Sequence, residues 1–387
     1  MMMNDAVAAI FGRTAPSTLA NRKPDTSRRG DHYRSGAVAR RRGLTVLVAD
    51  GAIPPIDKAC GEGLMPNSRR ELARLGVELD ARHGAEFAGI LFAGDGAQVA
   101  AEFSRGRGLG VRRVVLHAAL LERARELGVR MAWGAPVALR NGLVTIGGER
   151  CAHRWMVGAD GHASRVRTWA GLDADDLRSR RFGFRRHFRV QTWSEYVEIH
   201  WGDAGQAYVT PVGPEEICVA AITRQAGVRF GEVLRGLPFL AEKLAGAVTT
   251  TTERGAVTLT RRLQRVTRGN VALIGDASGS ADAITGEGLA MSFRQALLLA
   301  ESLASGGLEL YEARHGEILA LPQRMAVMMV VLDRFAWLWK RALPGLAARP
   351  ELFRKMLAVH VGERSLPQFV LRHGVEMGAL LLTPGAV

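Results

Sequence analysis

Runs of consecutive apolar residues, each ending at a turn signal, recur along the chain and predict buried strands. Residues 44–50 form one such run, which ends at Asp50 and is followed by Gly51 and the pair Pro54-Pro55. Between such runs, apolar residues recur at spacings of three and four and predict amphipathic helices. The other buried strands are predicted at 155–159 and 271–274, and the helices at 68–79, 112–127 and 289–303.

A different pattern fills residues 182–224, where β-rich or alternating segments are separated by turn residues at intervals of about ten residues. This pattern predicts an antiparallel sheet, and the helical stretch 228–245 is expected to cover it. Residues 97–107 are polar and glycine-rich, so they are expected to form a connection. The stripe 318–343 is rich in Met, Trp, Phe and Leu, which is more typical of a core than of a lipid-facing surface. A peripheral membrane contact remains an alternative for it.

Length and composition describe an ordinary globular protein. The chain has 387 residues, which suggests two or three structural units, and 47% of its residues are apolar. Its three cysteines lie far apart without a Cys-x-x-Cys spacing, which argues against a metal site or a disulfide framework. No apolar run near the C-terminus approaches the roughly 20 residues that span a bilayer, and no secretory signal pattern opens the chain. These features predict a cytoplasmic protein.

The net charge of +14 is concentrated in one segment. Residues 8–43 hold nine basic and two acidic side chains, so this segment carries a charge of +7, which is half of the net charge of the chain. Elsewhere the basic residues are scattered, and no basic strand interleaved with aromatic residues of the RNA-binding kind is present. The charge therefore does not predict a nucleic-acid partner.

The segment 271–289 carries the strongest chemical signal. Its apolar run stops at Gly275-Asp276, and a loop of small residues with Gly286 and Gly288 leads into the helical pattern. A strand that feeds a glycine-rich loop into a helix N-terminus is suited to bind an anion, because free backbone N–H groups and the positive helix end point at one spot. Asp276, at the strand end, can accept hydrogen bonds from a sugar-type hydroxyl.

This segment resembles the second flavin-binding motif of the FAD-dependent monooxygenase and geranylgeranyl-reductase superfamily, whose members share the para-hydroxybenzoate hydroxylase fold. Three further segments support the resemblance and follow the family's order along the chain. Residues 57–66 resemble the Cys-Gly-Gly/Glu-Gly-Leu segment of the reductase-like branch, 111–120 its Arg-x-x-Leu/Phe helix start, and 158–167 its Asp-Gly motif. The resemblance covers roughly residues 44–310.

The resemblance implies an α/β fold. A Rossmann-like FAD-binding domain would be interrupted by an antiparallel-sheet substrate domain and followed by a helical C-terminal region. The FAD-binding domain is expected at 1–75, 100–180 and 262–310, the substrate domain at 76–99 and 181–261, and the helical region at 311–387.

Four of the implied cofactor-binding residues belong to the strongest motif. By resemblance, Asp276 contacts the ribityl chain of the flavin. Gly275, Gly286 and Gly288 belong to the loop and helix N-terminus that face the pyrophosphate and the isoalloxazine ring.

The other implied cofactor-binding residues are Asp50, Arg113, Asp160 and Gly161. Asp160 and Gly161 form the Asp-Gly motif, and Arg113 is expected near a phosphate or the ribityl chain, with a surface arginine as the alternative. Asp50 ends a buried strand, where dinucleotide-binding folds bind the adenosine ribose hydroxyls. The alternative for Asp50 is a residue that opens the following turn.

Cys60 and Glu62 lie in the branch motif and are the candidate catalytic residues. A reactive thiolate needs cationic neighbours, and Lys58 is near in sequence only. The equally weighted alternative is that Cys60 is a small buried hydrophobic residue. No Ser/His/Asp or metal-ligating constellation is evident, so hydrolase and metalloenzyme functions have little support.

The glycine-rich fingerprint expected before the first strand–helix turn is missing. When residues 10–20 are aligned with the family's pattern, Phe11, Arg13 and Pro16 occupy the three glycine positions. Those glycines allow a tight turn, a close approach to the pyrophosphate and close helix packing. Residues 21–36 are polar and aperiodic and are expected to be a disordered loop.

Three explanations of this gap stay open: a faulty gene model, a diverged homologue with weak or absent FAD binding, or an Arg13 that pairs with a phosphate. The resemblance implies a FAD-dependent oxidoreductase with NAD(P)H as reductant and a hydrophobic or aromatic, polyketide-type small molecule as substrate. The reaction would be a monooxygenation, with geranylgeranyl-reductase-like reduction of isoprenoid double bonds as one alternative. A flavin-free remnant without activity is the other.

Overall fold

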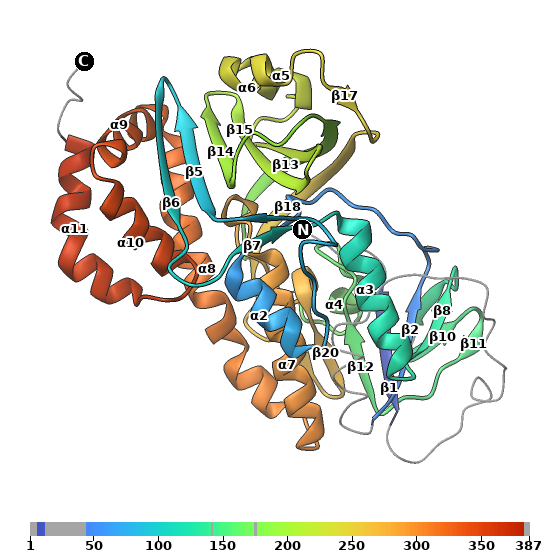
Figure 1. Cartoon of the computed structure of the whole chain (residues 1–387). Helices are drawn as coiled ribbons and strands as arrows, with labels where there is room; N and C mark the ends of the chain where they lie inside the picture. Colours follow the sequence, from blue (N-terminus) through green and yellow to red (C-terminus); the bar gives the residue numbers. More distant parts are fainter. Residues whose placement is uncertain (1–5, 12–43, 141, 174–175, 383–387) are drawn as a thin grey trace.

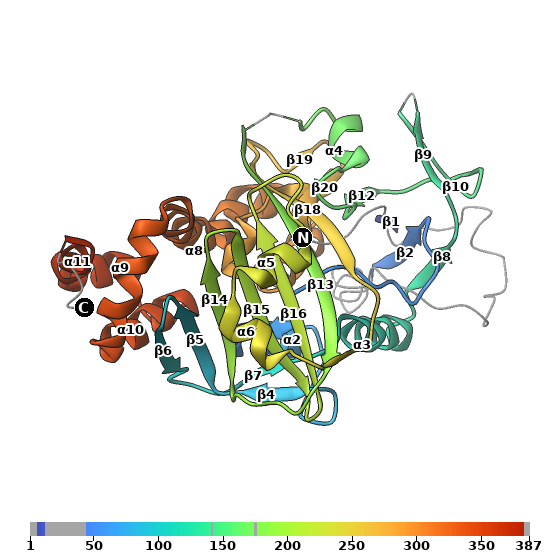
Figure 2. The same cartoon turned by 90° about the horizontal axis from the view of Figure 1, so that it is seen from above.

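The computed structural model describes residues 6–11, 44–140, 142–173 and 176–382 (Figures 1 and 2). Its first layer is a six-stranded sheet in which the apolar runs predicted from the sequence become neighbours. The strand order is β19 (Thr267–Arg268), β20 (Val271–Leu273), β12 (Trp155–Gly158), β1 (Ala6–Phe11), β2 (Thr45–Asp50) and β8 (Arg130–Trp133). β12 is parallel to β20, and β2 is parallel to β8. The predicted α/β class and the three buried strands are confirmed.

Strand β1 runs against its neighbours. It is antiparallel to both β2 and β12, so Ala6 pairs with Asp50 and Phe11 pairs with Thr45. Phe11 therefore lies at the amino edge of the parallel strands, whereas dinucleotides bind at their carboxyl edge. Phe11 therefore does not occupy the place of the first fingerprint glycine, although the sequence alignment put it there. Arg13, Pro16 and the segment 21–36 lie outside the described residues.

Helices pack on this sheet through a shared apolar core. Helix α3 (Arg113–Glu126) buries Leu116 and Leu120, and helix α7 (Gly288–Ala304) buries Phe293 and Leu299. Both helices lie where the periodicity predicted them. The predicted helix 68–79 is shorter, because α2 spans Pro66–Arg74 and begins at a proline, which is tolerated in a first helical turn.

A second, eight-stranded sheet lies beside the first layer (Figure 2). Its predicted strands are confirmed as β13 (Asp176–Arg189), β14 (Tyr196–Gly202), β15 (Gly205–Gly213) and β16 (Glu216–Thr223), and they pair antiparallel. The sheet is completed by β5 (Gly89–Gly94), β6 (Ala97–Glu102), β17 (Val248–Thr249) and β18 (Arg254–Arg262).

Two local predictions for this sheet were wrong. Residues 97–107 were expected to be a connection, but strand β6 occupies 97–102, with Val99 and Ala101 buried and Gln98 and Glu102 exposed. The alternation was hidden because most apolar positions there are alanines. The helix expected at 228–245 is split into α5 (Phe230–Arg235) and α6 (Pro238–Lys243). Pro238 cannot donate a helical hydrogen bond, so it starts a new helix.

Four helices complete the described chain: the first begins beside the six-stranded sheet, where the hydroxyl of Tyr311 donates to the carbonyl of Leu273 on β20 at 2.7 Å, and the last three lie at the opposite end of the molecule (Figure 1). They are α8 (Glu309–Arg334), α9 (Ala336–Ala347), α10 (Pro350–His360) and α11 (Leu366–Leu382). One side of the Met- and Trp-rich segment 318–343 belongs to the core, because Met325, Met329 and Trp339 are buried. Its other side is exposed, as at Trp337. Within the described part of the chain, no helix combines the length and the apolar character needed to cross a membrane.

Three short strands connect the two layers. β3 (Gly63–Leu64) and β4 (Ala85–Phe87) both pair antiparallel with β7 (Gly108–Gly110). This small sheet carries the motif segment 57–66 across to the eight-stranded sheet, where Thr210 on β15 donates a hydrogen bond to the carbonyl of Gly61 at 2.7 Å. The segment is therefore fixed between the two layers.

Candidate functional site

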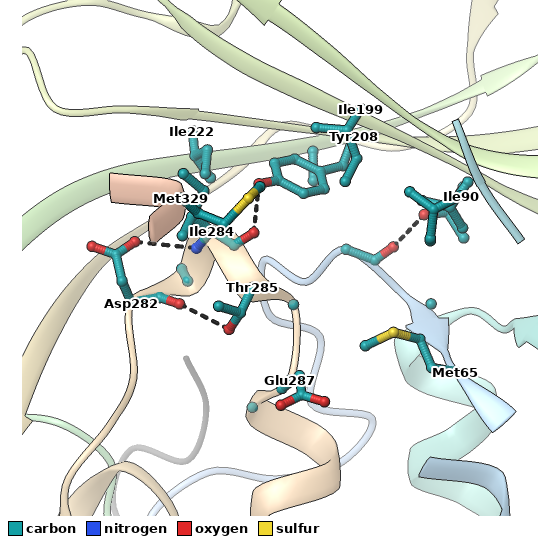
Figure 3. A pocket seen from close by; sticks show the side chains of 18 of the residues that line it. Met65, Ile90, Ile199, Tyr208, Ile222, Asp282, Ile284, Thr285, Glu287 and Met329 are labelled. Carbon is teal, nitrogen blue, oxygen red and sulfur yellow. Dashed lines mark hydrogen bonds between the residues drawn. The ribbon is translucent and has the colours of Figure 1, made fainter. Parts of the chain in front are cut away.

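An apolar cavity of about 210 Å³ lies between the motif loops and the eight-stranded sheet (Figure 3). One wall is the loop 59–63, and another is the segment 281–289 that leads into α7. Most of the remaining lining comes from β5, β13, β14, β15, β16, α8 and α10. Side chains that face it include Met65, Ile90, Ile199, Tyr208, Ile222, Ile284 and Met329 (Figure 3). Two of the predicted motifs thus meet at a space that is mostly hydrocarbon-lined.

The segment before α7 forms a tight turn at the cavity wall. Asp282 caps the short 3₁₀ helix η3 (Ala283–Thr285), because its Oδ1 accepts a hydrogen bond from the N–H of Ile284 at 3.1 Å. Gly286 then takes a left-handed conformation with φ of 67°. The first α-helical bond joins the N–H of Met291 to the carbonyl of Glu287, so the N–H groups of 288–290 have no helical acceptor. This is the helix N-terminus that the sequence predicted, and Gly288 is its first residue.

Gly275 and Asp276 follow β20 in the 3₁₀ helix η2 (Gly275–Ser278). Gly275 has φ of 64°, and its N–H donates to Oε1 of Gln295 on α7 at 2.7 Å. Asp276 is buried and contributes to the cavity lining. The strand end is therefore tied to α7 by a side chain that lies two turns into that helix.

Asp160 and Gly161 lie elsewhere. The carboxylate of Asp160 accepts hydrogen bonds from the hydroxyl of Ser164 and from the N–H groups of Arg165 and Val166, at 2.7 Å and 3.0 Å for the two N–H groups. It thereby satisfies the first two N–H groups of α4 (Arg165–Trp169), whose N-cap residue is Ser164. Burial raises the pKa of this carboxyl against the lowering effect of those hydrogen bonds. Neither Asp160 nor Gly161, which has φ of 75°, is part of the cavity lining.

Asp50 is buried at the carboxyl edge of the first sheet, where its Oδ1 accepts the N–H of Ala52 at 2.8 Å. This contact is the turn-opening one that the sequence offered as the alternative. Arg113 is buried at the start of α3, and burial lowers the pKa of its guanidinium. The nearby carboxylates of Glu62 and Asp57 act in the opposite direction and raise the pKa of Arg113. Arg113 is thus not a surface arginine.

Glu62 is the centre of a buried polar cluster. Its Oε1 accepts the N–H of Arg113 at 2.9 Å, and its Oε2 lies 2.6 Å from Nε2 of His187. Nδ1 of His187 lies 2.9 Å from Nη1 of Arg185 and 2.9 Å from the hydroxyl of Thr251. A guanidinium can only donate, so Nδ1 accepts and Nε2 carries the proton that is donated to Glu62. Glu62 therefore accepts two hydrogen bonds as a carboxylate.

Glu62 also holds an unusual backbone conformation, with φ of 59°. A non-glycine residue in the left-handed region costs roughly 1–2 kcal/mol. The two hydrogen bonds of its side chain offset this cost and tie the loop 57–65 to α3 and to β13. Arg185 reinforces the tie by pairing with Asp57, whose pKa is lowered by this hydrogen bond and charge although burial raises it.

Cys60 is a buried thiol rather than a poised thiolate. Its Sγ accepts the N–H of Glu62 at 3.3 Å. Burial raises the pKa of the Cys60 thiol, and the neighbouring Glu62 carboxylate raises it further, against a smaller lowering effect of Arg113. Lys58 is not among the groups that lower it. The chemistry of Cys60 in this setting is that of a small apolar group that lines the cavity.

Within the described residues, one group of side chains has a composition that a metal ion could use: Glu62, His187 and Cys218. The 2.6 Å between Oε2 of Glu62 and Nε2 of His187 is a hydrogen-bond distance. Two ligands of one cation stand farther apart, because each metal–ligand bond is about 2.0–2.2 Å. The group is therefore a hydrogen-bonded pair beside a buried thiol.

Several residues at the site lie outside the sequence motifs. Arg181 on β13 is buried and pairs with Asp282 and with Asp333 at the end of α8, the latter at 2.7 Å. Tyr208 donates its hydroxyl proton toward the carbonyl of Ile284 at 2.8 Å (Figure 3). The sequence did contain a signal, since Arg181, Arg185 and His187 share one face of β13 as polar residues among apolar ones.

Glu287 lies inside the motif between Gly286 and Gly288, and the resemblance implies no role for it. It is buried in the cavity wall, and its Oε1 lies 3.4 Å from Nδ2 of Asn67. Its Oε2 has no hydrogen-bond partner among the described residues. A bound molecule with a donor group at this point would satisfy the buried oxygen.

The described residues fit one half of a flavin site. Gly61 and Gly286 both line the cavity, and a Cβ atom on either glycine would meet no atom within 4 Å. The open space between the two loops can accept a planar ring, and the N-terminus of α7 can face a phosphate. The opposite half does not fit, because β1 is reversed and leads away from the carboxyl edge.

No family model matches the chain. It is 25% identical over 334 residues to the menaquinone reductase of Mycobacterium tuberculosis, covering 76% of this chain and 80% of that protein. Its fold is similar to a flavoprotein/dehydrogenase from Cytophaga hutchinsonii, with a TM-score of 0.74, 17% identity and coverage of 90% and 95% of the two chains.

Two further similar folds are those of a reductase-like protein and a hydroxylase. A geranylgeranyl bacteriochlorophyll reductase-like protein from Thermoplasma acidophilum has a TM-score of 0.65 at 18% identity, over 89% of this chain and 92% of that one. Anhydrotetracycline hydroxylase OxyS from Streptomyces rimosus has a TM-score of 0.64 at 23% identity, over 85% and 73%. The chain has the fold of the FAD-dependent monooxygenase and geranylgeranyl-reductase superfamily, as the motifs predicted.

Proposed function

We propose that the protein is a FAD-dependent oxidoreductase that reduces a carbon–carbon double bond of an apolar, isoprenoid-type molecule with electrons from NAD(P)H. The observation that carries the proposal is the cavity, whose walls run from the flavin motif to the methionines and phenylalanine of α8 and α10. An apolar wall favours a hydrocarbon chain over a polar substrate. The likeness to a menaquinone reductase supports the same class of substrate.

Bound FAD would supply hydride transfer, and the protein supplies binding, orientation and exclusion of water. Gly275, Asp276, Gly286 and Gly288 are the residues that would hold the ribityl chain and pyrophosphate. The apolar side chains hold the hydrocarbon and keep water out. Reduction of a double bond adds one hydride and one proton, and Oε2 of Glu287 is the buried oxygen in the wall that can pass that proton or hold the substrate.

The first experiment asks whether the purified full-length chain binds FAD. The two visible absorption bands of oxidised flavin, present after purification or reconstitution, are expected. A colourless protein that cannot be reconstituted contradicts the proposal and favours the flavin-free remnant. Sequencing the 5′ region of the gene in all frames tests whether a glycine-rich loop precedes the chain as written.

The second experiment separates reduction from oxygenation. The flavoprotein is incubated without oxygen with NADPH, or NADH, and a menaquinone that carries an unsaturated isoprenoid chain. A product that has gained two hydrogen atoms in its side chain is expected. Rapid, substrate-stimulated oxygen uptake in air together with a hydroxylated product would instead identify a monooxygenase. The variant Glu287→Gln should lose most of the turnover while it retains FAD.

A further inference from the structure

Helix α8 is apolar on two opposite faces in its second half. The inner face, with Met325, Met328 and Met329, lines the cavity. The outer face carries Val327 and Val331, which are 63% and 44% exposed. A helix of a soluble domain ordinarily has a polar outer face. The outer face of α8 therefore needs a partner of its own.

Exposed apolar side chains continue through the connection between α8 and α9 and into the start of α9. Phe335 is 45% exposed and Trp337 is 54% exposed. Val327 and Val331 lie four residues apart and so share one face of α8, and Phe335 is the exposed residue between α8 and α9. Large exposed aromatic side chains in a contiguous stripe mark an interaction surface. Its apolar members are Val327, Val331, Phe335 and Trp337, which we call the α8 outer face.

Arginines frame this face. Arg324 precedes Val327 by three residues and Arg334 follows Val331 by three, so both lie on the same side of α8. The guanidinium carbon of Arg334 lies 6.0 Å from the ring centre of Phe335, and that of Arg341 lies 5.6 Å from the ring centre of Trp337. Aromatic rings with flanking cations are typical of segments that lie in the interface of a membrane.

The segment that follows α8 is strongly basic, and its charge indicates which kind of partner fits the α8 outer face. Residues 334–372 contain eight lysines and arginines and two acidic residues. One acid, Glu351, pairs with Arg354, and the other, Glu363, contacts Ser104. A second copy of this chain would bring its own +14 charge and its own arginines to the contact, which opposes self-association. An anionic surface is electrostatically complementary.

We propose that the α8 outer face docks on the surface of an anionic lipid bilayer. Phe335, Trp337 and the two valines enter the boundary between headgroups and acyl chains, and Arg324, Arg334 and Arg341 contact lipid phosphates. The docked part is the second half of α8, whose inner face lines the cavity, at the end of the molecule away from the six-stranded sheet (Figure 1). This surface does not depend on the function proposed above, because it needs neither flavin nor turnover.

The test is co-sedimentation of the full-length chain with vesicles. One set of vesicles contains phosphatidylcholine alone, and the other contains phosphatidylcholine mixed with phosphatidylglycerol. Binding is expected to the anionic vesicles and is expected to weaken with added salt. The double variant F335S/W337S should lower the partition coefficient at least about tenfold, because two large apolar side chains no longer leave water.

Two further variants make the result specific. R324Q/R334Q should weaken binding to the anionic vesicles by about fivefold or more per charge removed, and leave the weak binding to phosphatidylcholine unchanged. Phe239→Ser removes an equally exposed aromatic residue on α6 and should bind as the wild type does. Circular dichroism and urea unfolding confirm that each variant is folded, which is expected because the changed side chains are exposed.

Three results would overturn the proposal. The wild-type chain does not bind the anionic vesicles, or F335S/W337S binds as well as the wild type does. In the third, sedimentation velocity shows a concentration-dependent dimer that F335S/W337S abolishes, so that a second copy covers the face. A colourless protein that binds vesicles would contradict only the proposed function, and a flavoprotein with turnover but no vesicle binding would contradict only this proposal.

Discussion

Glu62 and His187 are 125 positions apart in the sequence, yet Oε2 of Glu62 lies 2.6 Å from Nε2 of His187 in the interior. The pair joins the motif loop of the first layer to strand β13 of the second. Because Nδ1 of His187 also accepts from Arg185, Nε2 carries the proton and donates it to Oε2 of Glu62. The loop that lines the cavity is therefore positioned by a side chain from the other sheet.

The variant Glu62→Gln is expected to lower the free energy of unfolding by about 2–4 kcal/mol. Both partners of the carboxylate are donors, so an amide NH₂ group would face a donor, and the charge that balances Arg185 would be lost. Urea unfolding measures the change. Glu351→Gln, which removes a fully exposed pair with Arg354, should leave the unfolding midpoint where it is. An equal effect of the two variants would contradict the role of the buried pair.

The variant Arg181→Met is expected to cost about 3–5 kcal/mol of stability. Removal of the Arg181 guanidinium leaves the carboxylates of Asp282 and Asp333 buried without the cation that they share. Arg224 also contacts Asp333, at 2.7 Å, but is 41% exposed. Arg224→Gln should therefore cost less than about 1 kcal/mol. Chemical denaturation of both variants tests the difference, and similar losses would mean that Arg181 does not link the layers.

His315 predicts a pH dependence of stability. It is buried beside Gln295 and Ser278, and burial lowers its pKa from 6.5 to about 4. Since the folded value is the lower one, the unfolded chain binds more protons between these values. Its contribution is complete above pH 6.5, falls as the pH decreases toward 4 and is constant below. Denaturation curves across this range should show the decline in the wild type.

The matched variants for this prediction are His315→Gln and His153→Gln. His315→Gln should flatten part of the decline, and the partly exposed His153→Gln should keep the slope of the wild type. Burial also lowers the pKa of His117, to about 3, so a residual slope of the same sign remains. If the stability of His315→Gln depended on pH as steeply as that of the wild type, the imidazole of His315 would bind its proton equally well in the folded and the unfolded chain.

The cysteines predict a simple labelling pattern. Cys60, Cys151 and Cys218 are free and buried, and burial raises the pKa of Cys151 to about 11. The native protein should react slowly with a thiol reagent such as DTNB, because the reactive thiolate is scarce and inaccessible. Unfolding in urea should release all three thiols at once. Rapid labelling of Cys60 in the native state would restore it as a candidate nucleophile.

The cavity predicts an effect of size on substrate binding. Ile199 faces the space between the motif loops and the sheet (Figure 3). Ile199→Trp should raise the KM for an isoprenoid substrate by about tenfold or more while the FAD content stays the same, because overpacking costs typically 1–3 kcal/mol. Leu143→Trp, at an exposed position of β10 (Leu143–Ile146), is the control. If both variants keep the wild-type KM, the substrate binds elsewhere.

The local pattern predicted most elements because each depended on neighbours in the chain. The run 271–274, the loop through Gly286 and the helix of α7 follow one another directly, so their geometry is set by short-range sterics and hydrogen bonding. The same local information failed at 97–107, where small residues masked a strand, and at Pro238, where one residue divides a helix.

The sequence by itself determined the superfamily fold, the strand–loop–helix that would face a flavin, and the buried strands. Only the tertiary structure decided how the candidates are used: Glu62 accepts from His187, Cys60 is a neutral thiol, and Asp160 accepts the first two N–H groups of a helix. The antiparallel direction of β1 was also decided only there. The physical reason is that burial, protonation and strand direction depend on groups brought together from distant positions, and no local pattern records those partners.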